Sequence, residues 1–73
     1  MKINKWEVIY LDLSLRSFAL TAASSLKLGR EIINSGGAGV MYVNDAVAGR
    51  DIIIMLSHVR DIVISETEEL NED

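Results

Sequence analysis

The chain has 73 residues, which is enough for one small hydrophobic core and too few for two. It contains no cysteine and one histidine, which excludes a disulfide framework and a thiolate nucleophile and fits a cytoplasmic protein. A core of this size is marginal, and 49% of the residues are hydrophobic, so we expect the chain to gain stability as a homo-oligomer, a dimer or larger.

The net charge of −4 is distributed unevenly along the chain. Residues 66–73 hold five acidic residues and no basic one, whereas residues 1–65 hold seven basic and six acidic residues. This division predicts a single α+β domain over residues 1–65 and an acidic, disordered tail over residues 66–73. The longest stretch free of Asp, Glu, Lys and Arg has 13 residues, at 32–44, which is too short to cross a bilayer. We read no export signal and expect no membrane association.

The amino-terminal third predicts a strand followed by an ambiguous segment. Trp6, Val8 and Tyr10 alternate with their neighbours as in a strand whose two faces are both partly covered. Residues 15–23 fit either a second strand over 18–22 or part of one long helix over about 14–35. We favour the strand, because Ser24 and Ser25 suit the start of a helix better than its interior, although no glycine or asparagine turn precedes it.

The clearest helix signal lies at residues 26–35. Ser25 is a suitable amino-terminal cap, and Gly36 and Gly37 suit a left-handed helix end. Glycines also occur in phosphate-binding loops, but such loops precede a helix, where free N–H groups face the anion. Because these glycines follow the helix, we interpret them as a helix stop and expect no nucleotide or other cofactor.

Two strands joined by a turn-forming loop are predicted after the helix, at residues 40–44 and 52–56. A break at Ser57 and His58 separates them from residues 59–65, which fit a further strand or the same strand bent by a bulge. The order is then ββαββ or βαββ. Either order predicts an α+β fold, with a small, single-layer, largely antiparallel sheet and one helix packed on one face.

Residues 52–56 form an unbroken apolar run. Successive side chains of a strand point to opposite faces, so such a run predicts that both faces of the strand are covered. One helix covers only one face of a single sheet, and we therefore expect another copy or a partner protein to cover the other. The expected interface consists of Ile52, Ile54, Leu56, Trp6 and Tyr42.

No group of residues predicts catalysis or metal binding. Ser57, His58 and Asp61 supply the residue types of a nucleophilic relay, but neighbours in a strand point apart, so we assign no catalytic residue. With one histidine and no cysteine we assign no metal site, and we interpret Asp45 and Asp51 as turn residues.

Four basic residues are candidates for polar contacts with a partner: Lys27, Arg30, Arg50 and Arg60. Lys27 and Arg30 share one face of the predicted helix, but nothing in the sequence places the other two beside them. Nucleic-acid binders concentrate several phosphate contacts in one basic patch. A nucleic-acid partner is therefore not expected.

The sequence favours a small, non-enzymatic protein-interaction or regulatory module that binds itself and another protein. Proteins of this size and composition include accessory proteins of bacteria and phages, among them inhibitors of other proteins. Two alternatives stay open: a nucleic-acid-binding regulator, and a protein that binds or sequesters a small ligand at subunit interfaces.

Overall fold

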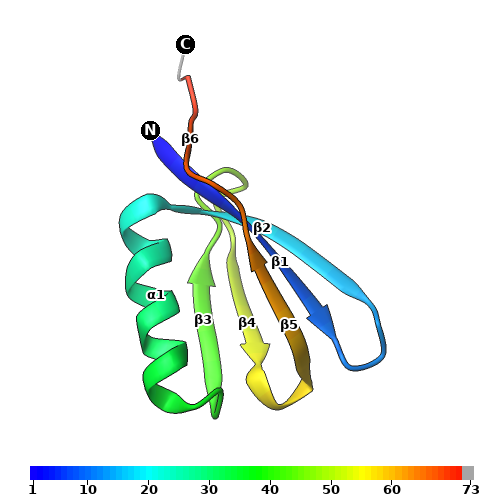
Figure 1. Ribbon diagram of the computed structural model, residues 1–73. Coiled ribbons are helices and arrows are strands. Elements are labelled where there is room, and N and C mark those ends of the chain that lie inside the picture. The colour runs from blue at the N-terminus through cyan, green and yellow to red at the C-terminus, as the bar shows by residue number, and fades with distance from the viewer. Residues whose placement is uncertain (72–73) are drawn as a thin grey trace.

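The computed structural model describes residues 1–71 of the chain as an α+β domain with one α-helix and antiparallel sheets (Figure 1). The elements in chain order are β1 (Lys2–Tyr10), β2 (Leu15–Thr21), α1 (Ala22–Ser35), β3 (Val40–Asn44), β4 (Asp51–Met55), a 3₁₀ helix (Leu56–His58), β5 (Val59–Ile64) and β6 (Glu68–Glu69). The predicted α+β class and the strand–strand–helix opening are confirmed.

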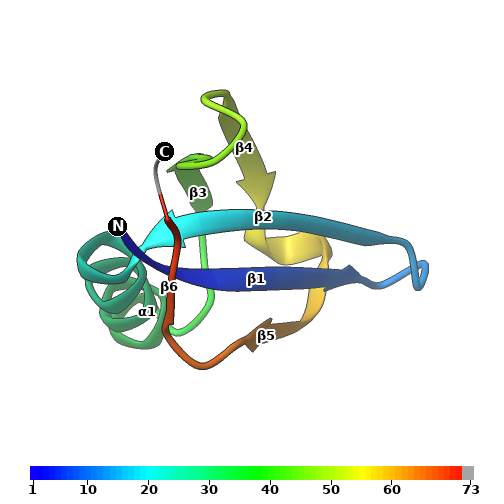
Figure 2. The same ribbon diagram turned by 90° about the horizontal axis from the view of Figure 1, so that it is seen from above.

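The strands form two sheets, so the predicted single layer is wrong. The larger sheet has the order β2-β1-β5, with the short β6 also paired to β1, and the smaller sheet is the β3–β4 hairpin. Every pairing is antiparallel. The hairpin crosses the larger sheet, and α1 lies at one end of β1 and β2 and alongside β3 (Figures 1 and 2). The two sheets cover each other's inner faces, and α1 packs against the same core, whereas the prediction had the helix alone covering one face of a single sheet.

The core lies between the two sheets. Its buried side chains come from alternate positions of four strands and from the 3₁₀ helix: Trp6, Val8, Phe18, Leu20, Met41, Val43, Ile52, Ile54 and Leu56. The apolar run at residues 52–56 therefore alternates, with one set of side chains in the core and Ile53 and Met55 outside it.

The segment that was ambiguous in sequence is the strand β2. Phe18 lies opposite Trp6 in the register, and their rings stack with centroids 6.0 Å apart. The turn before it has no glycine; instead Leu13 adopts a left-handed φ of 70°. Asp12 Oδ1 accepts a hydrogen bond from the Ser14 N–H at 2.9 Å. This side-chain hydrogen bond stabilises a turn that lacks the glycine or asparagine usual at such a position.

The helix α1 begins four residues earlier than predicted, at Ala22. Thr21 is its cap, because Thr21 Oγ1 accepts a hydrogen bond from the Ser24 N–H at 3.2 Å. Ser25, the predicted cap, is buried and accepts a hydrogen bond from the Trp6 indole N–H at 2.8 Å. The predicted end of the helix is confirmed, with Gly36 at a φ of 67° in the left-handed region.

The carboxyl-terminal part of the chain pairs with β1. The predicted break at Ser57 and His58 is a 3₁₀ helix, and β5 follows it along β1. Beyond β5, the Asn4 side-chain amide donates hydrogen bonds to Ser65 O and Thr67 Oγ1, both at 3.0 Å.

The segment predicted as a disordered tail includes the short strand β6. Glu68–Glu69 pairs with Lys2 and Ile3 of β1, and the Leu70 N–H donates to Met1 O at 2.7 Å. The amino-terminal ammonium group lies 3.0 Å from Glu69 Oε1. Residues 72–73, the rest of that predicted tail, lie outside the described residues.

Candidate interaction surface

The outward face of the β3–β4 hairpin carries four exposed apolar side chains. Val40 lies opposite Met55, and Tyr42 lies opposite Ile53 in the antiparallel register. Their exposed fractions are 58% and 50% for the first pair and 61% and 62% for the second. Directly opposed side chains on one face of a sheet are in contact distance, so these two pairs form one continuous apolar patch, called here the hairpin face.

The hairpin face matches the largest apolar patch of a typical monomer in size. Its exposed side chains present roughly 400 Å² of surface, within the range of about 300–600 Å² for the largest apolar patch of a typical monomer, which is often functional. Single exposed apolar residues need no explanation, but a contiguous patch on a regular sheet does. The hairpin face is therefore the candidate site of interaction.

A polar pair closes one end of the hairpin face. The Asn44 side-chain amide donates a hydrogen bond to Asp51 Oδ1 at 2.8 Å across the two strands. This bond, together with the hydroxyl of Tyr42, lowers the pKa of the Asp51 carboxyl below its usual value. The same carboxylate raises the pKa of the Tyr42 hydroxyl. At neutral pH the apolar patch thus ends at a charged, hydrogen-bonded boundary.

The loop between β3 and β4 is held by Asp45, which is buried. Its Oδ1 accepts hydrogen bonds from the backbone N–H groups of Val47 and Ala48, both at 3.0 Å. Burial by itself raises the pKa of the Asp45 carboxyl, but these bonds and the nearby Arg50 outweigh it, so the pKa is lowered. The Ala46 N–H donates to Ala19 O at 2.8 Å, so the loop also fixes the hairpin to the free edge of β2.

Four of the five residues predicted for an interface are covered within the chain itself. Trp6, Ile52, Ile54 and Leu56 lie in the core, and Tyr42 alone is on the surface. Val40, Ile53 and Met55, which are exposed, are not among the residues predicted for the interface. The pairing register of the hairpin could have identified them, because a strand packed on a core through Ile52 and Ile54 must direct Ile53 outward.

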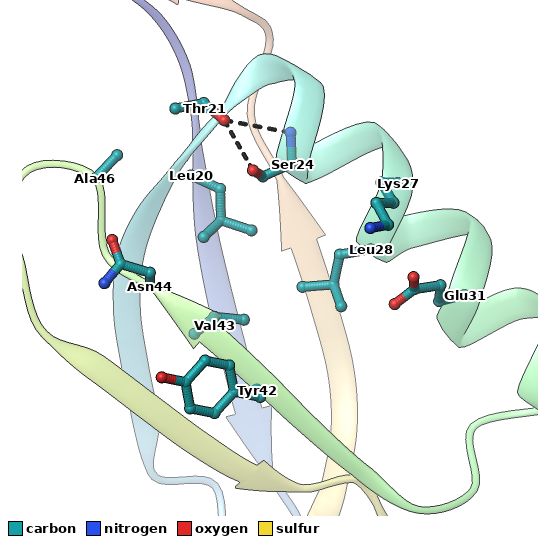
Figure 3. Close-up of a pocket in the computed structure, with 10 residues that line it drawn as sticks. All are labelled: Leu20, Thr21, Ser24, Lys27, Leu28, Glu31, Tyr42, Val43, Asn44 and Ala46. Carbon is teal, nitrogen blue, oxygen red and sulfur yellow. Dashed lines mark hydrogen bonds between the residues drawn. The ribbon is translucent and has the colours of Figure 1, made fainter.

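A groove runs between α1 and β3 beside the hairpin face (Figure 3). It has a volume of about 310 Å³, with Lys27, Leu28 and Glu31 on the helix side and Tyr42 and Asn44 on the strand side. A second cavity of about 130 Å³ extends it toward the start of β3 and shares Leu28 and Glu31. The groove thus follows β3 along most of its length.

The structure does not bring the four predicted basic contacts into one patch. Lys27 lines the groove between α1 and β3, whereas Arg30 lines a different depression with Leu26 and Ile33 of the helix. Arg50 is in the β3–β4 loop, and the Arg60 guanidinium lies 3.4 Å from the neighbouring Asp61 carboxylate.

The residues with catalytic potential lie apart from the hairpin face. His58 is exposed and borders a shallow depression with Tyr10 and Asp12, where the β1–β2 turn meets the 3₁₀ helix. Among residues 1–71, no group of three or more His, Cys, Asp or Glu side chains is arranged to hold a metal ion. In the same part of the chain, α1 has neither the length nor the hydropathy of a membrane-spanning helix.

Comparison of the chain with protein-family models, curated proteins and solved structures found no match.

Proposed function

We propose that the chain is a non-enzymatic protein-interaction module in the cytoplasm and that two copies associate through the hairpin face. The observation that supports this proposal is the pairing of Val40 with Met55 and of Tyr42 with Ile53, all exposed, on the outer side of a regular hairpin. Its inner side is already in the core, so a second copy would supply the missing cover for the outer side.

A second copy is a suitable partner for this surface because of its chemistry. A two-fold dimer brings the same patch of each subunit against itself, and a patch without charges meets its own copy without repulsion. The hairpin face fits this requirement, since Asn44 and Asp51 lie at its margin and not within it.

The area sets the expected strength of the dimer. Roughly 400 Å² on each subunit is about half of the ~800 Å² per partner in a standard-sized stable interface. We therefore expect a weak dimer whose population depends on protein concentration. At low concentration the chain would be mostly monomeric, and its surface would then be free to bind another protein. We propose that it acts as an accessory protein that inhibits or regulates an enzyme, as some proteins of bacteria and phages do.

The test is the molar mass by sedimentation equilibrium over a hundredfold range of protein concentration, for three proteins. The unmodified chain should change from monomer to dimer, and Ile53→Lys should remain monomeric because it places a charge in the contact. The matched control is Val63→Lys, which replaces a half-exposed valine of β5 and should dimerise normally.

A monomer at every concentration would contradict the proposal. Dimerisation of Ile53→Lys with the same affinity as the unmodified chain would contradict it as well, since the contact would then lie elsewhere.

A further inference from the structure

The strand β3 pairs with β4 on one side only, and within residues 1–71 the hairpin sheet has no third strand. Two backbone hydrogen bonds bracket the pairing, from the Asp45 N–H to Arg50 O at 2.8 Å and from the Leu56 N–H to Gly39 O at 3.0 Å. Hydrogen-bonded and non-hydrogen-bonded positions alternate in an antiparallel pair. The backbone N–H and C=O groups that face away from β4 are therefore those of Val40, Tyr42 and Asn44.

These backbone groups open onto the groove between α1 and β3. The helix stands beside β3 on the side away from β4 (Figure 1), and Figure 3 shows Tyr42 and Asn44 across the groove from Lys27 and Glu31. In the described part of the chain, no hydrogen bond joins the outward backbone groups of β3 to the helix or to another strand. The groove thus combines a free strand edge with an opposite wall.

The chain covers another edge of its sheets but leaves this one open. The free edge of β2 is covered by the β3–β4 loop, through the hydrogen bond from the Ala46 N–H to Ala19 O. Proteins commonly block an exposed edge with lysine, proline or a bulge in the strand itself. The sequence of β3, Val-Met-Tyr-Val-Asn, has no such residue, and its register with β4 is continuous.

We infer that the edge of β3 binds an extended peptide segment of a partner protein, which adds to the hairpin sheet as a further strand between β3 and α1. An extended backbone is the chemical complement of alternating free N–H and C=O groups. Leu20, Leu28 and Val43 line the groove, so the side chains of the segment that point inward should be aliphatic at alternate positions. This inference goes beyond self-association and uses a different side of the hairpin.

A second copy of the chain is a poor occupant of the groove. In each copy α1 lies beside the free edge of β3 (Figure 1). If β3 of one copy entered the groove of a second copy, the α1 helices of the two copies would collide. A single extended segment brings no helix, and the cavity of about 310 Å³ beside Tyr42 and Asn44 is at the lower end of the ~300–1,000 Å³ range of ligand sites.

The test uses fluorescein-labelled, amidated heptapeptides with threonine at even positions and all Val, all Ile, all Leu or all Phe at odd positions. Binding is measured by fluorescence anisotropy, with the Met55→Lys variant as the protein, because a charge at this exposed position of the hairpin face prevents dimerisation and leaves position 53 free for substitution. At least one peptide should bind saturably. Two versions of that peptide, N-methylated at even or at odd positions, should then differ, because only one set of N–H groups faces β3.

A pair of proline variants locates the edge. Tyr42 and Ile53 are directly opposite, and the N–H of each points away from the other strand, so proline removes one outward donor in either case. Tyr42→Pro removes the donor that faces the groove and should weaken peptide binding at least about tenfold. Ile53→Pro removes the donor on the far edge of β4 and should leave binding unchanged. Far-ultraviolet circular dichroism confirms that both variants are folded.

Three outcomes would overturn the inference: no saturable binding by any peptide, equal binding of both N-methylated versions, or equal binding by the two folded proline variants. None of these outcomes affects the dimer proposal, and loss of the dimer does not affect peptide binding. The two proposals therefore fail separately.

Discussion

The hydrogen bond between Trp6 and Ser25 links the larger sheet to the helix inside the core. The indole N–H donates to Ser25 Oγ at 2.8 Å, and both side chains are buried. Ser25→Ala removes the acceptor and leaves the indole N–H of the buried Trp6 without its partner. An unpaired buried donor costs about 1–3 kcal/mol, while alanine gains up to about 0.5 kcal/mol over serine as a helix former. The net expected loss is about 1–2 kcal/mol.

That loss is a large fraction of the stability of so small a domain. At roughly 0.05–0.15 kcal/mol per residue, the free energy of unfolding of this chain is on the order of 4–11 kcal/mol. For domains of 60–100 residues, each 1 kcal/mol shifts Tm by about 4–8 °C, so we expect Tm to fall by about 5–15 °C. Urea denaturation followed by circular dichroism measures the same loss as a lower midpoint with an unchanged slope.

The neighbouring serine provides the matched control. Ser24 occupies the same first turn of α1, but its side chain is exposed, so Ser24→Ala should change stability by less than about 0.5 kcal/mol. A double-mutant cycle with Trp6→Phe should give a coupling energy of about 1 kcal/mol between Trp6 and Ser25. Equal stabilities of the two serine variants, or a coupling energy of zero, would refute the assigned role of this hydrogen bond.

Three further predictions concern the turn, the loop and the carboxyl-terminal segment. Leu13→Gly should stabilise the protein by up to about 1 kcal/mol, because φ at Leu13 is 70° and its side chain is exposed; a lower urea midpoint would contradict this. The pKa of Asp45 is lowered in the folded state, so the carboxylate stabilises the fold above its unfolded pKa, and this contribution disappears as the pH falls through the folded pKa. The difference in Tm between the unmodified chain and Asp45→Asn should therefore be largest near pH 7 and vanish in acid, and a constant difference would exclude the charge as its cause. Deleting residues 67–73 should lower the free energy of unfolding by about 1–3 kcal/mol, because Asn4 loses Thr67 and β1 loses β6; an unchanged Tm would favour a tail that does not contribute to the fold.

The parts of this fold that the sequence predicts are those specified by residues close together in the chain. The glycines at Gly36 and Gly37 end the helix as expected, and the β3–β4 hairpin follows from two β-rich segments around a turn-forming loop. The strand favoured over residues 18–22 is confirmed in kind, but β2 spans Leu15–Thr21, so it begins three residues earlier and ends one residue earlier than predicted.

The parts that were missed depend on distant residues. The sequence favours Ser25 as the cap because the partner of Ser25, Trp6, lies on another element, and the true cap at Thr21 has the same kind of side chain. The charge of residues 66–71 predicts disorder, but it does not reveal that Asn4 and Met1 provide hydrogen-bonding partners for Thr67 and Leu70.

The candidate surface was missed for a related reason. A continuous apolar run predicts cover on both faces of a strand, and the run itself does not say which of its residues face inward. The register of β4 with β3 and the packing of Ile52 and Ile54 decide that Ile53 and Met55 face outward. The expected interface residues were for this reason mostly core residues.

The central position of β1 has a consequence for the kinetics of folding. Its first partner, β2, follows after a short turn, but its second, β5, lies near the other end of the chain, with Trp6 opposite Ile64. The β1–β2 hairpin can therefore form early, while the other edge of β1 stays without this partner until residues 59–64 have been synthesised. Closing so long a loop slows folding, and we expect the sheet to be completed only after β5 leaves the ribosome.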